Sequence, residues 1–198
     1  KKPELLDLPR AIAGLKRNLE EINNVSRIIQ FLLLLSDFSD RKTTVLRQNV
    51  RLSDVISVVN ANVAYLLKQK NLTLSKLILN PAITVKGKPV ALEKMLLNLV
   101  RNAITYSPAG STVTIELTRT ERGAPVLSVR DEGSGMSPHD LARVFEPFYR
   151  GKNAHPGGTG LGLSIVNEVV RLHKAHIRVK STLGEGTEFR VEFPFSRS

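Results

Sequence analysis

Two glycine-rich turns bracket the stretch from Asp131 to Leu163. The first reads Asp-Glu-Gly-Ser-Gly over residues 131–135, and the second reads Gly-Gly-Thr-Gly-Leu-Gly-Leu over residues 157–163. Glycine lets the backbone adopt positive φ and approach a ligand closely, and the N–H groups exposed in such turns bind phosphates. The second turn leads into a helical pattern, and a helix N-terminus behind a glycine turn is a ready anion site. The stretch therefore predicts a nucleotide pocket.

Two asparagines upstream add a possible metal and phosphate site. Asn98 and Asn102 lie four residues apart in a helix expected from Pro89 to about Ile104, so their side chains share one face. Apolar residues occupy the remaining faces of that helix. Amide oxygens suit a hydrated Mg²⁺ ion, which takes oxygen ligands and keeps several waters. The alternative is that one asparagine caps a loop and the other is merely exposed.

Four motifs occur in a fixed order within about 70 residues. They are Asn98-Leu-Val-Arg-Asn102-Ala103, Asp131-Glu-Gly-Ser-Gly135, Phe145-Glu-Pro-Phe-Tyr149-Arg150 and Gly158-Thr-Gly-Leu-Gly162-Leu. Each is weak alone, but together they resemble the N, G1, F and G2 boxes of the sensor histidine kinases of two-component systems. The resemblance covers residues 47–198 as the catalytic ATP-binding domain. It extends less specifically to residues 10–44, as the second helix of the dimerisation and phosphotransfer hairpin.

The resemblance implies a role for each motif in binding ATP and Mg²⁺. Asp131 would accept a hydrogen bond from the adenine amino group, a role that suits an ionised carboxylate at a strand end. Tyr106 would lie against the purine, and the Thr187 hydroxyl would lie near it. Gly133 and Gly135 would let the backbone pass under the base.

The phosphate end of the site is implied in the same way. Asn98 and Asn102 would hold Mg²⁺ and phosphate oxygens, and Arg150 and Lys152 would meet phosphates from a flexible lid. The phosphate turn and the start of the following helix would comprise Gly158, Thr159, Gly160, Leu161, Gly162 and Leu163.

The chain departs from the family pattern in two places. The family's phosphoacceptor is a histidine followed by an acidic residue and Arg-Thr-Pro, and His139, His155, His173 and His176 all lack that context. We expect these four to be structural or surface residues and the chain to begin after the acceptor helix, so that it cannot autophosphorylate alone. Thr105 also stands where the family usually has a lysine, which removes one phosphate contact and leaves open a nucleotide-binding regulatory module of a degenerate kinase.

Other members of the same ATPase superfamily are disfavoured by one residue. Gyrase-type, chaperone and mismatch-repair ATPases use a glutamate as general base at the position of Asn98, and an amide cannot take a proton from water. Transfer to a histidine side chain is therefore preferred to hydrolysis.

Composition limits the partners. The chain has 198 residues, no cysteine and a formal net charge of +11, but the charges are spread and aromatic residues are only 5%, so direct nucleic-acid binding is not predicted. No run approaches the roughly 20 apolar residues that span a bilayer. By the resemblance, we expect a response regulator as partner, a homodimer in the full-length protein, and a cytoplasmic portion of a protein anchored in the inner membrane through upstream segments.

The elements that must position these residues form an α+β pattern. Residues 1–46 are expected to contain a helix from Arg10 to Ser39, whose a/d seam of apolar residues calls for a helical bundle. Residues 47–198 are expected to form a two-layer sandwich, a mixed and mostly antiparallel sheet covered by helices. Ser53 is expected to cap a helix that ends near Leu67. The predicted strands are 45–50, 71–79, 83–86, 112–120, 125–130, 175–181 and 187–193.

Overall fold

The computed structural model describes residues 11–15, 17, 18, 21, 22, 25, 29, 48–151, 154, 155 and 158–195. The described positions between 11 and 29 are helical, as the heptad pattern predicts, and the rest of the predicted helix lies outside the described residues. Five apolar residues of this segment, Ile12, Leu15, Ile22, Val25 and Ile29, are 45–63% exposed. Among the described residues, no helix is both long and apolar enough to cross a membrane.

A five-stranded mixed sheet forms one layer of the molecule. Its strands are β2 (Thr73–Ile78), β4 (Thr112–Arg119), β5 (Pro125–Asp131), β7 (Gly186–Glu192) and β6 (His176–Thr182), in that spatial order. β2 pairs with β4 in parallel, and the other three pairs are antiparallel. Side chains alternate between the two faces, so Phe189 and Val191 are buried while Arg190 between them is half-buried.

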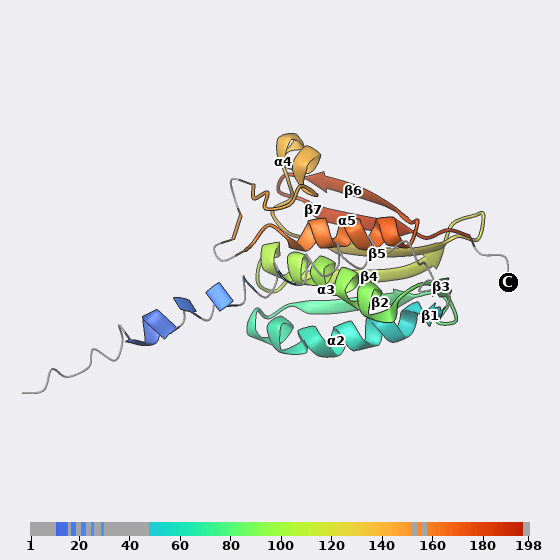
Figure 1. Cartoon of the computed structure of the whole chain (residues 1–198), viewed down its shortest axis with the longest axis horizontal. Helices are drawn as coiled ribbons and strands as arrows, with labels where there is room; N and C mark the ends of the chain where they lie inside the picture. The colour runs from blue at the N-terminus through green and yellow to red at the C-terminus, as the bar shows by residue number, and fades with distance from the viewer. Residues whose placement is uncertain are drawn as a thin grey trace, which may run out of the picture.

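Helices α2 (Leu52–Gln69), α3 (Pro89–Tyr106) and α5 (Gly162–Leu172) cover one face of this sheet (Figure 1). The short helix α4 (Pro138–Arg143) lies apart, beside the segment that leads to α5. The apolar sides of the three long helices and the inner face of the sheet make one continuous core. This arrangement is the predicted α+β two-layer sandwich.

One local prediction is wrong, and one predicted strand lies outside the main sheet. Ser53 is not an N-cap, because α2 begins at Leu52 and the Ser53 hydroxyl donates instead to the carbonyl of Pro81 (2.9 Å). The predicted strand at 83–86 exists as β3 (Thr84–Lys86) but stays outside the main sheet and pairs with β1 (Asn49–Arg51). The first turn of α2 carries Asp54, and a negative charge at the N-terminal end of a helix is favourable.

A buried histidine joins the end of α5 to the start of α3. The His173 side chain is 4% exposed, and its Nδ1 donates to the Val169 carbonyl (2.7 Å) while Nε2 accepts from the Lys88 backbone N–H (3.2 Å). This pattern requires the neutral ring. Burial lowers the pKa of His173, and the nearby Lys88 charge lowers it further, against an opposing effect of the Val169 carbonyl. A Cβ at Gly87 would collide with the ring, so this contact also requires glycine there.

The lowered pKa of His173 should make the protein less stable in mild acid. Because its folded pKa is depressed, its contribution is fully present above the unfolded pKa of 6.5 and is lost as pH falls below that value toward the folded pKa. We expect the free energy of unfolding, measured with urea, to fall between pH 7 and 5. His173→Gln should be less stable at pH 7 but should flatten this dependence. The exposed His176→Gln should keep the parent slope, and equal slopes in all three proteins would contradict the assignment.

Candidate nucleotide-binding site

A cavity of about 450 Å³ opens where the C-terminal half of α3, the N-terminus of α5 and the segment between α4 and α5 meet. All but two of the residues predicted for the site line it. They are Asn98, Asn102, Tyr106, Asp131, Gly135, Arg150, Gly158, Thr159, Gly160, Leu161, Gly162, Leu163 and Thr187. Gly133 does not line the cavity, and Lys152 lies outside the described residues.

Asp131 is a buried carboxylate held in a fixed orientation. It ends β5, is 6% exposed, and its Oδ1 accepts hydrogen bonds from the backbone N–H groups of Gly133 (2.9 Å) and Thr187 (3.2 Å). Oδ2 accepts none from the described residues. Burial raises the pKa of Asp131, and the two backbone hydrogen bonds oppose that rise. The site therefore offers one oriented acceptor atom on a cavity wall.

The glycines of the first turn are required by the protein's own backbone. A Cβ at Gly133 would lie 2.8 Å from the Tyr106 carbonyl oxygen, and a Cβ at Gly135, where φ is +64°, would collide with the Thr182 carbonyl. The turn is thus wedged between the end of α3 and the β6–β7 turn, and Ser134 N donates to Tyr106 O (3.4 Å). Passage under a bound base, predicted from the sequence, is not needed to explain these two glycines.

The two asparagines present different atoms to the cavity. The Asn98 Nδ2 donates to the Lys94 carbonyl (2.9 Å), and its Oδ1 would lie 3.3 Å from a Cβ at Gly162. The Oδ1 of Asn98 therefore points toward the N-terminus of α5. Asn102 is half-buried, and its amide has no hydrogen-bond partner among the described residues. The C-terminal end of α3 and the N-terminal end of α5 lie at the same end of the molecule (Figure 1).

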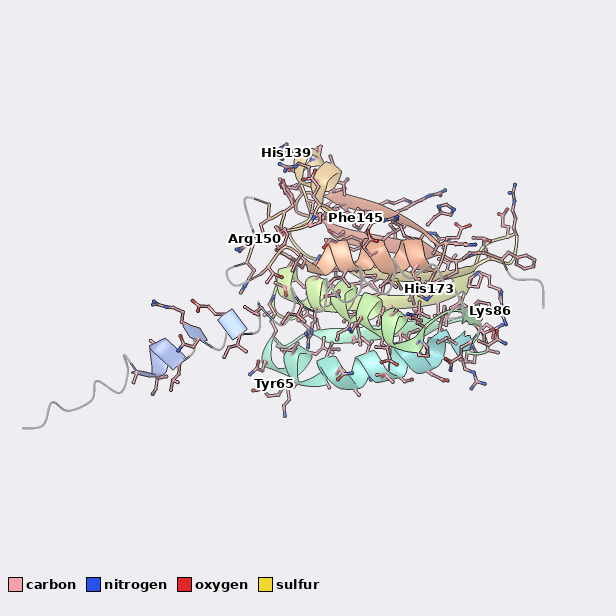
Figure 2. All side chains as sticks on the ribbon, in the orientation of Figure 1. Tyr65, Lys86, His139, Phe145, Arg150 and His173 are labelled. Carbon is pink, nitrogen blue, oxygen red and sulfur yellow. The ribbon has the colours of Figure 1, made fainter. Side chains whose placement is uncertain are left out.

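The segment from Phe148 to Leu161 is anchored at both ends. Phe148 N donates to Gly160 O (3.1 Å), and Phe148 itself has φ +64°, while a Cβ at Gly160 would lie 2.6 Å from the Phe148 carbonyl carbon. The Tyr149 hydroxyl donates to Asp140 (2.8 Å) on α4. Arg150 lies at the end of the molecule away from His173 (Figure 2), and its Nη2 donates to the His155 carbonyl (2.9 Å).

The N-terminus of α5 is free of side-chain caps. Its N-cap residue is Leu161, which makes no side-chain hydrogen bond to the helix, and the residues before it are the predicted phosphate turn. The N–H groups of a first turn have no partners within the helix and carry a partial positive charge. This end of α5 can therefore accept an anion.

The sequence did not single out several residues of the cavity wall. Lys94 and Arg101 share the pocket face of α3, and their spacing from Asn98 could have revealed them. Leu183 comes from the distant β6–β7 turn, which no local pattern connects to the site. His155 also lines the cavity, whereas His139 and His176 are exposed and His173 is structural.

The cavity could hold a cation such as Mg²⁺ only through the oxygens of amide side chains and of a bound nucleotide. Within the described residues, no group of three His, Cys, Asp or Glu side chains could hold a metal ion. The Asn98 Oδ1 and the Asn102 amide oxygen, with phosphate oxygens and waters, would suit Mg²⁺, which seldom has an all-protein cage.

Comparison with known proteins agrees with this geometry. Residues 87–197 match the family of histidine kinase-, DNA gyrase B- and HSP90-like ATPases. The match covers more than half of the chain, so the chain belongs to this family, and the predicted resemblance is confirmed, while the domain bounds 47–198 stay a prediction. Within the family, its relatives identify it as the ATP-binding catalytic part of a sensor histidine kinase.

Two curated relatives illustrate the similarity. The sensor-like histidine kinase SenX3 of Mycobacterium tuberculosis is 46% identical over 116 residues, which cover 57% of this chain and 28% of the relative. The phosphate regulon sensor protein PhoR of Pseudomonas aeruginosa is 31% identical over 188 residues, which cover 93% of this chain and 42% of the relative. The chain thus spans less than half the length of these relatives.

Solved structures show the same fold. Full-length ShkA, in complex with AMPPNP, matches with a TM-score of 0.78 at 23% identity over 100% of this chain and 41% of that chain. The mycobacterial sensor histidine kinase MprB matches with a TM-score of 0.66 at 29% identity over 75% of this chain and 97% of that chain.

Proposed function

We propose that the cavity binds ATP with Mg²⁺ and presents the γ-phosphoryl group to a histidine. The observation that carries this proposal is the oriented Asp131 carboxylate, which lines the cavity and whose Oδ1 is held by two backbone N–H groups, while Oδ2 accepts no hydrogen bond from the described residues. A carboxylate oxygen with unused acceptor capacity can take a hydrogen bond from the adenine amino group. Tyr106 and Thr187 flank this end of the cavity and are assigned to the purine.

The phosphates are assigned to the opposite wall. The N-terminus of α5 and the turn from Gly158 to Leu163 would receive phosphate oxygens, since the first-turn N–H groups have no partner within the helix and, among the described residues, only the Leu161 N–H has a side-chain acceptor in the turn, the Thr159 hydroxyl (3.4 Å). Asn98 and Asn102 would hold Mg²⁺, which neutralises charge on the phosphates when bound. Arg150 and Lys152, which belong to the segment between α4 and α5, would contact the phosphates. Gly133 would act indirectly, by keeping the Asp131 turn against α3.

This chain's own residues position and polarise the nucleotide without donating a nucleophile. Phosphoryl transfer depends mainly on alignment and on charge stabilisation, which a rigid acceptor and a helix N-terminus provide. Neither asparagine can remove a proton from water, so hydrolysis is not favoured. None of the four histidines has the phosphoacceptor context, and we assign the acceptor to a separate helix.

The larger assembly is proposed from the same family membership. Residues 1–46 would contribute to the dimerisation and phosphotransfer hairpin, with residues 47–198 as the catalytic domain. The exposed apolar residues near the N-terminus would then pack in a homodimeric bundle. The phosphohistidine would pass its group to a response regulator, and this part of the protein would lie on the cytoplasmic side of an inner-membrane anchor.

Calorimetry and a phosphorylation assay test the proposal. We expect AMPPNP with Mg²⁺ to bind with a Kd tighter than about 1 mM. With labelled ATP, the chain alone should acquire no phosphohistidine but should label a separately supplied phosphotransfer hairpin that carries its histidine. Label on the chain itself would contradict the acceptor assignment. A Kd weaker than this value would favour the alternative suggested by Thr105, a regulatory module of a degenerate kinase.

A further inference from the structure

Three residues of α3 form a ridge along the cavity. Lys94, Arg101 and Thr105 follow one another at steps of seven and four, which places them within about 40° of each other around the helix axis. All three line the cavity, beside Asn98 and Asn102. The ridge therefore carries two cations on the wall that also carries the two asparagines.

The two cations of the ridge are available to a ligand. Neither the Lys94 nor the Arg101 side chain has a hydrogen-bond or ion-pair partner in the described part of the chain, and Lys94 is half-buried. Other polar groups nearby are already engaged. The Thr105 hydroxyl donates to the Arg101 carbonyl (2.7 Å), and Arg150 donates to the His155 carbonyl (2.9 Å).

No carboxylate among the described residues of the cavity wall neutralises the ridge. In this described part, the acidic residues that line the cavity are Asp131 and Asp140. Asp131 accepts from Gly133 and Thr187, and Asp140 accepts from the Ser137 and Tyr149 hydroxyls at 2.8 Å each. The wall around Arg101 and Lys94 is therefore positive and attracts anions.

The position of the ridge along α3 selects the phosphate end of the nucleotide. Tyr106 at the C-terminal end of α3 contacts the turn that follows Asp131, whereas Asn98 faces Gly162 at the start of α5. Arg101 lies about 7 Å back from Tyr106 along the helix axis, and Lys94 lies about 18 Å back. Along α3, Arg101 therefore lies between the base end and Asn98, which faces the phosphate turn, and Lys94 lies one turn beyond Asn98.

We propose that Arg101, assisted by Lys94, binds the terminal phosphates of the nucleotide and makes the site prefer a triphosphate to a diphosphate. This inference rests on the proposed function, namely that the cavity binds ATP. An arginine can give two parallel hydrogen bonds to phosphate oxygens, and lysine adds a point charge. Arg101, one helical turn before Thr105, would thereby supply the positive charge that the family's usual lysine at position 105 would have given.

The test compares three ligands by calorimetry in the presence of Mg²⁺: AMPPNP, ADP and adenosine. Arg101→Ala should weaken AMPPNP binding about tenfold or more, weaken ADP binding less, and leave adenosine binding unchanged. Lys94→Ala should act in the same direction, and Arg101→Lys should recover part of the loss. The matched control is Arg122→Ala, which removes the same charge from the exposed β4–β5 turn, outside the cavity.

The outcomes separate the inference from the proposed function. If the parent protein binds none of the three ligands, the proposed function fails and the inference fails with it. If the parent binds AMPPNP and Arg101→Ala binds it equally well, only the inference is overturned. Equal losses for AMPPNP and adenosine would indicate a structural effect and would also overturn it. So would an equal loss in Arg122→Ala, because that would reflect general charge attraction.

Discussion

Asp131→Asn is expected to abolish nucleotide binding and to leave the protein folded. The asparagine Oδ1 can still accept from the N–H groups of Gly133 and Thr187, which hold Oδ1 of the aspartate now. This leaves Nδ2, a donor, on the cavity side, where it would oppose the donor amino group of adenine. One hydrogen bond to a charged group is lost and two donors are left facing each other, so affinity should fall at least about 100-fold.

The stability of the same variant provides an independent check. Because burial raises the pKa of Asp131, the contribution of its carboxyl to stability is fully present below the unfolded pKa and is lost as pH rises through the folded pKa. At neutral pH the ionised group is a cost, so Asp131→Asn should unfold at the parent's urea concentration or a higher one. Glu132→Gln is the control, since Glu132 is exposed and does not line the cavity. If Asp131→Asn bound nucleotide with an affinity within a few-fold of the parent's, the assignment of Asp131 to adenine would be refuted.

Local patterns predicted most elements of the fold but not their pairing. The helix from Pro89 and the strands on either side of Glu121-Arg-Gly123 depend on periodicity and turn residues, and the structure contains them. The parallel pairing of β2 with β4 joins segments about 40 residues apart, and the separate β1–β3 pair joins segments about 35 residues apart. Nothing in any of these strands specifies its partner. Ser53 was misassigned because a hydroxyl near a helix start can equally bond a neighbouring loop.

The candidate site was predictable where its residues form motifs and not elsewhere. Glycine turns and the asparagine pair carry a local signal, because few other residue types can meet their backbone or ligand requirements. Arg101 carries only its helical spacing from Asn98, which many exposed helix arginines share, and Leu183 carries no local signal because it lies in a turn of the closing strand pair. Only the folded arrangement brings them to one wall. The requirement for Gly133 was predicted, but its physical reason, the nearby Tyr106 carbonyl, needed the structure.

Gly186→Ala is expected to disrupt the strand pair that orients Asp131. Gly186 has φ +108°, and a Cβ there would collide with the Asp131 carbonyl oxygen, which is backbone and cannot move aside cheaply. To relieve the collision, β7 must separate from β5 at the pair of Asp131 with Thr187. We expect a loss of about 3 to 4 kcal/mol in the free energy of unfolding, with weaker nucleotide binding in the fraction that stays folded, because Thr187 no longer donates to Asp131.

Gly184→Ala separates this collision from the ordinary cost of a left-handed residue. Gly184 lies in the same β6–β7 turn with φ +86°, but a Cβ there would meet nothing within 4 Å. It should therefore lose only about 1 to 2 kcal/mol, the cost of placing a side chain in that backbone region, and should bind nucleotide as the parent does. Urea unfolding and calorimetry on the two variants measure both effects. Equal losses of stability would mean that φ alone sets the requirement for glycine, and unchanged binding in folded Gly186→Ala would mean that the Thr187 N–H does not orient the carboxylate.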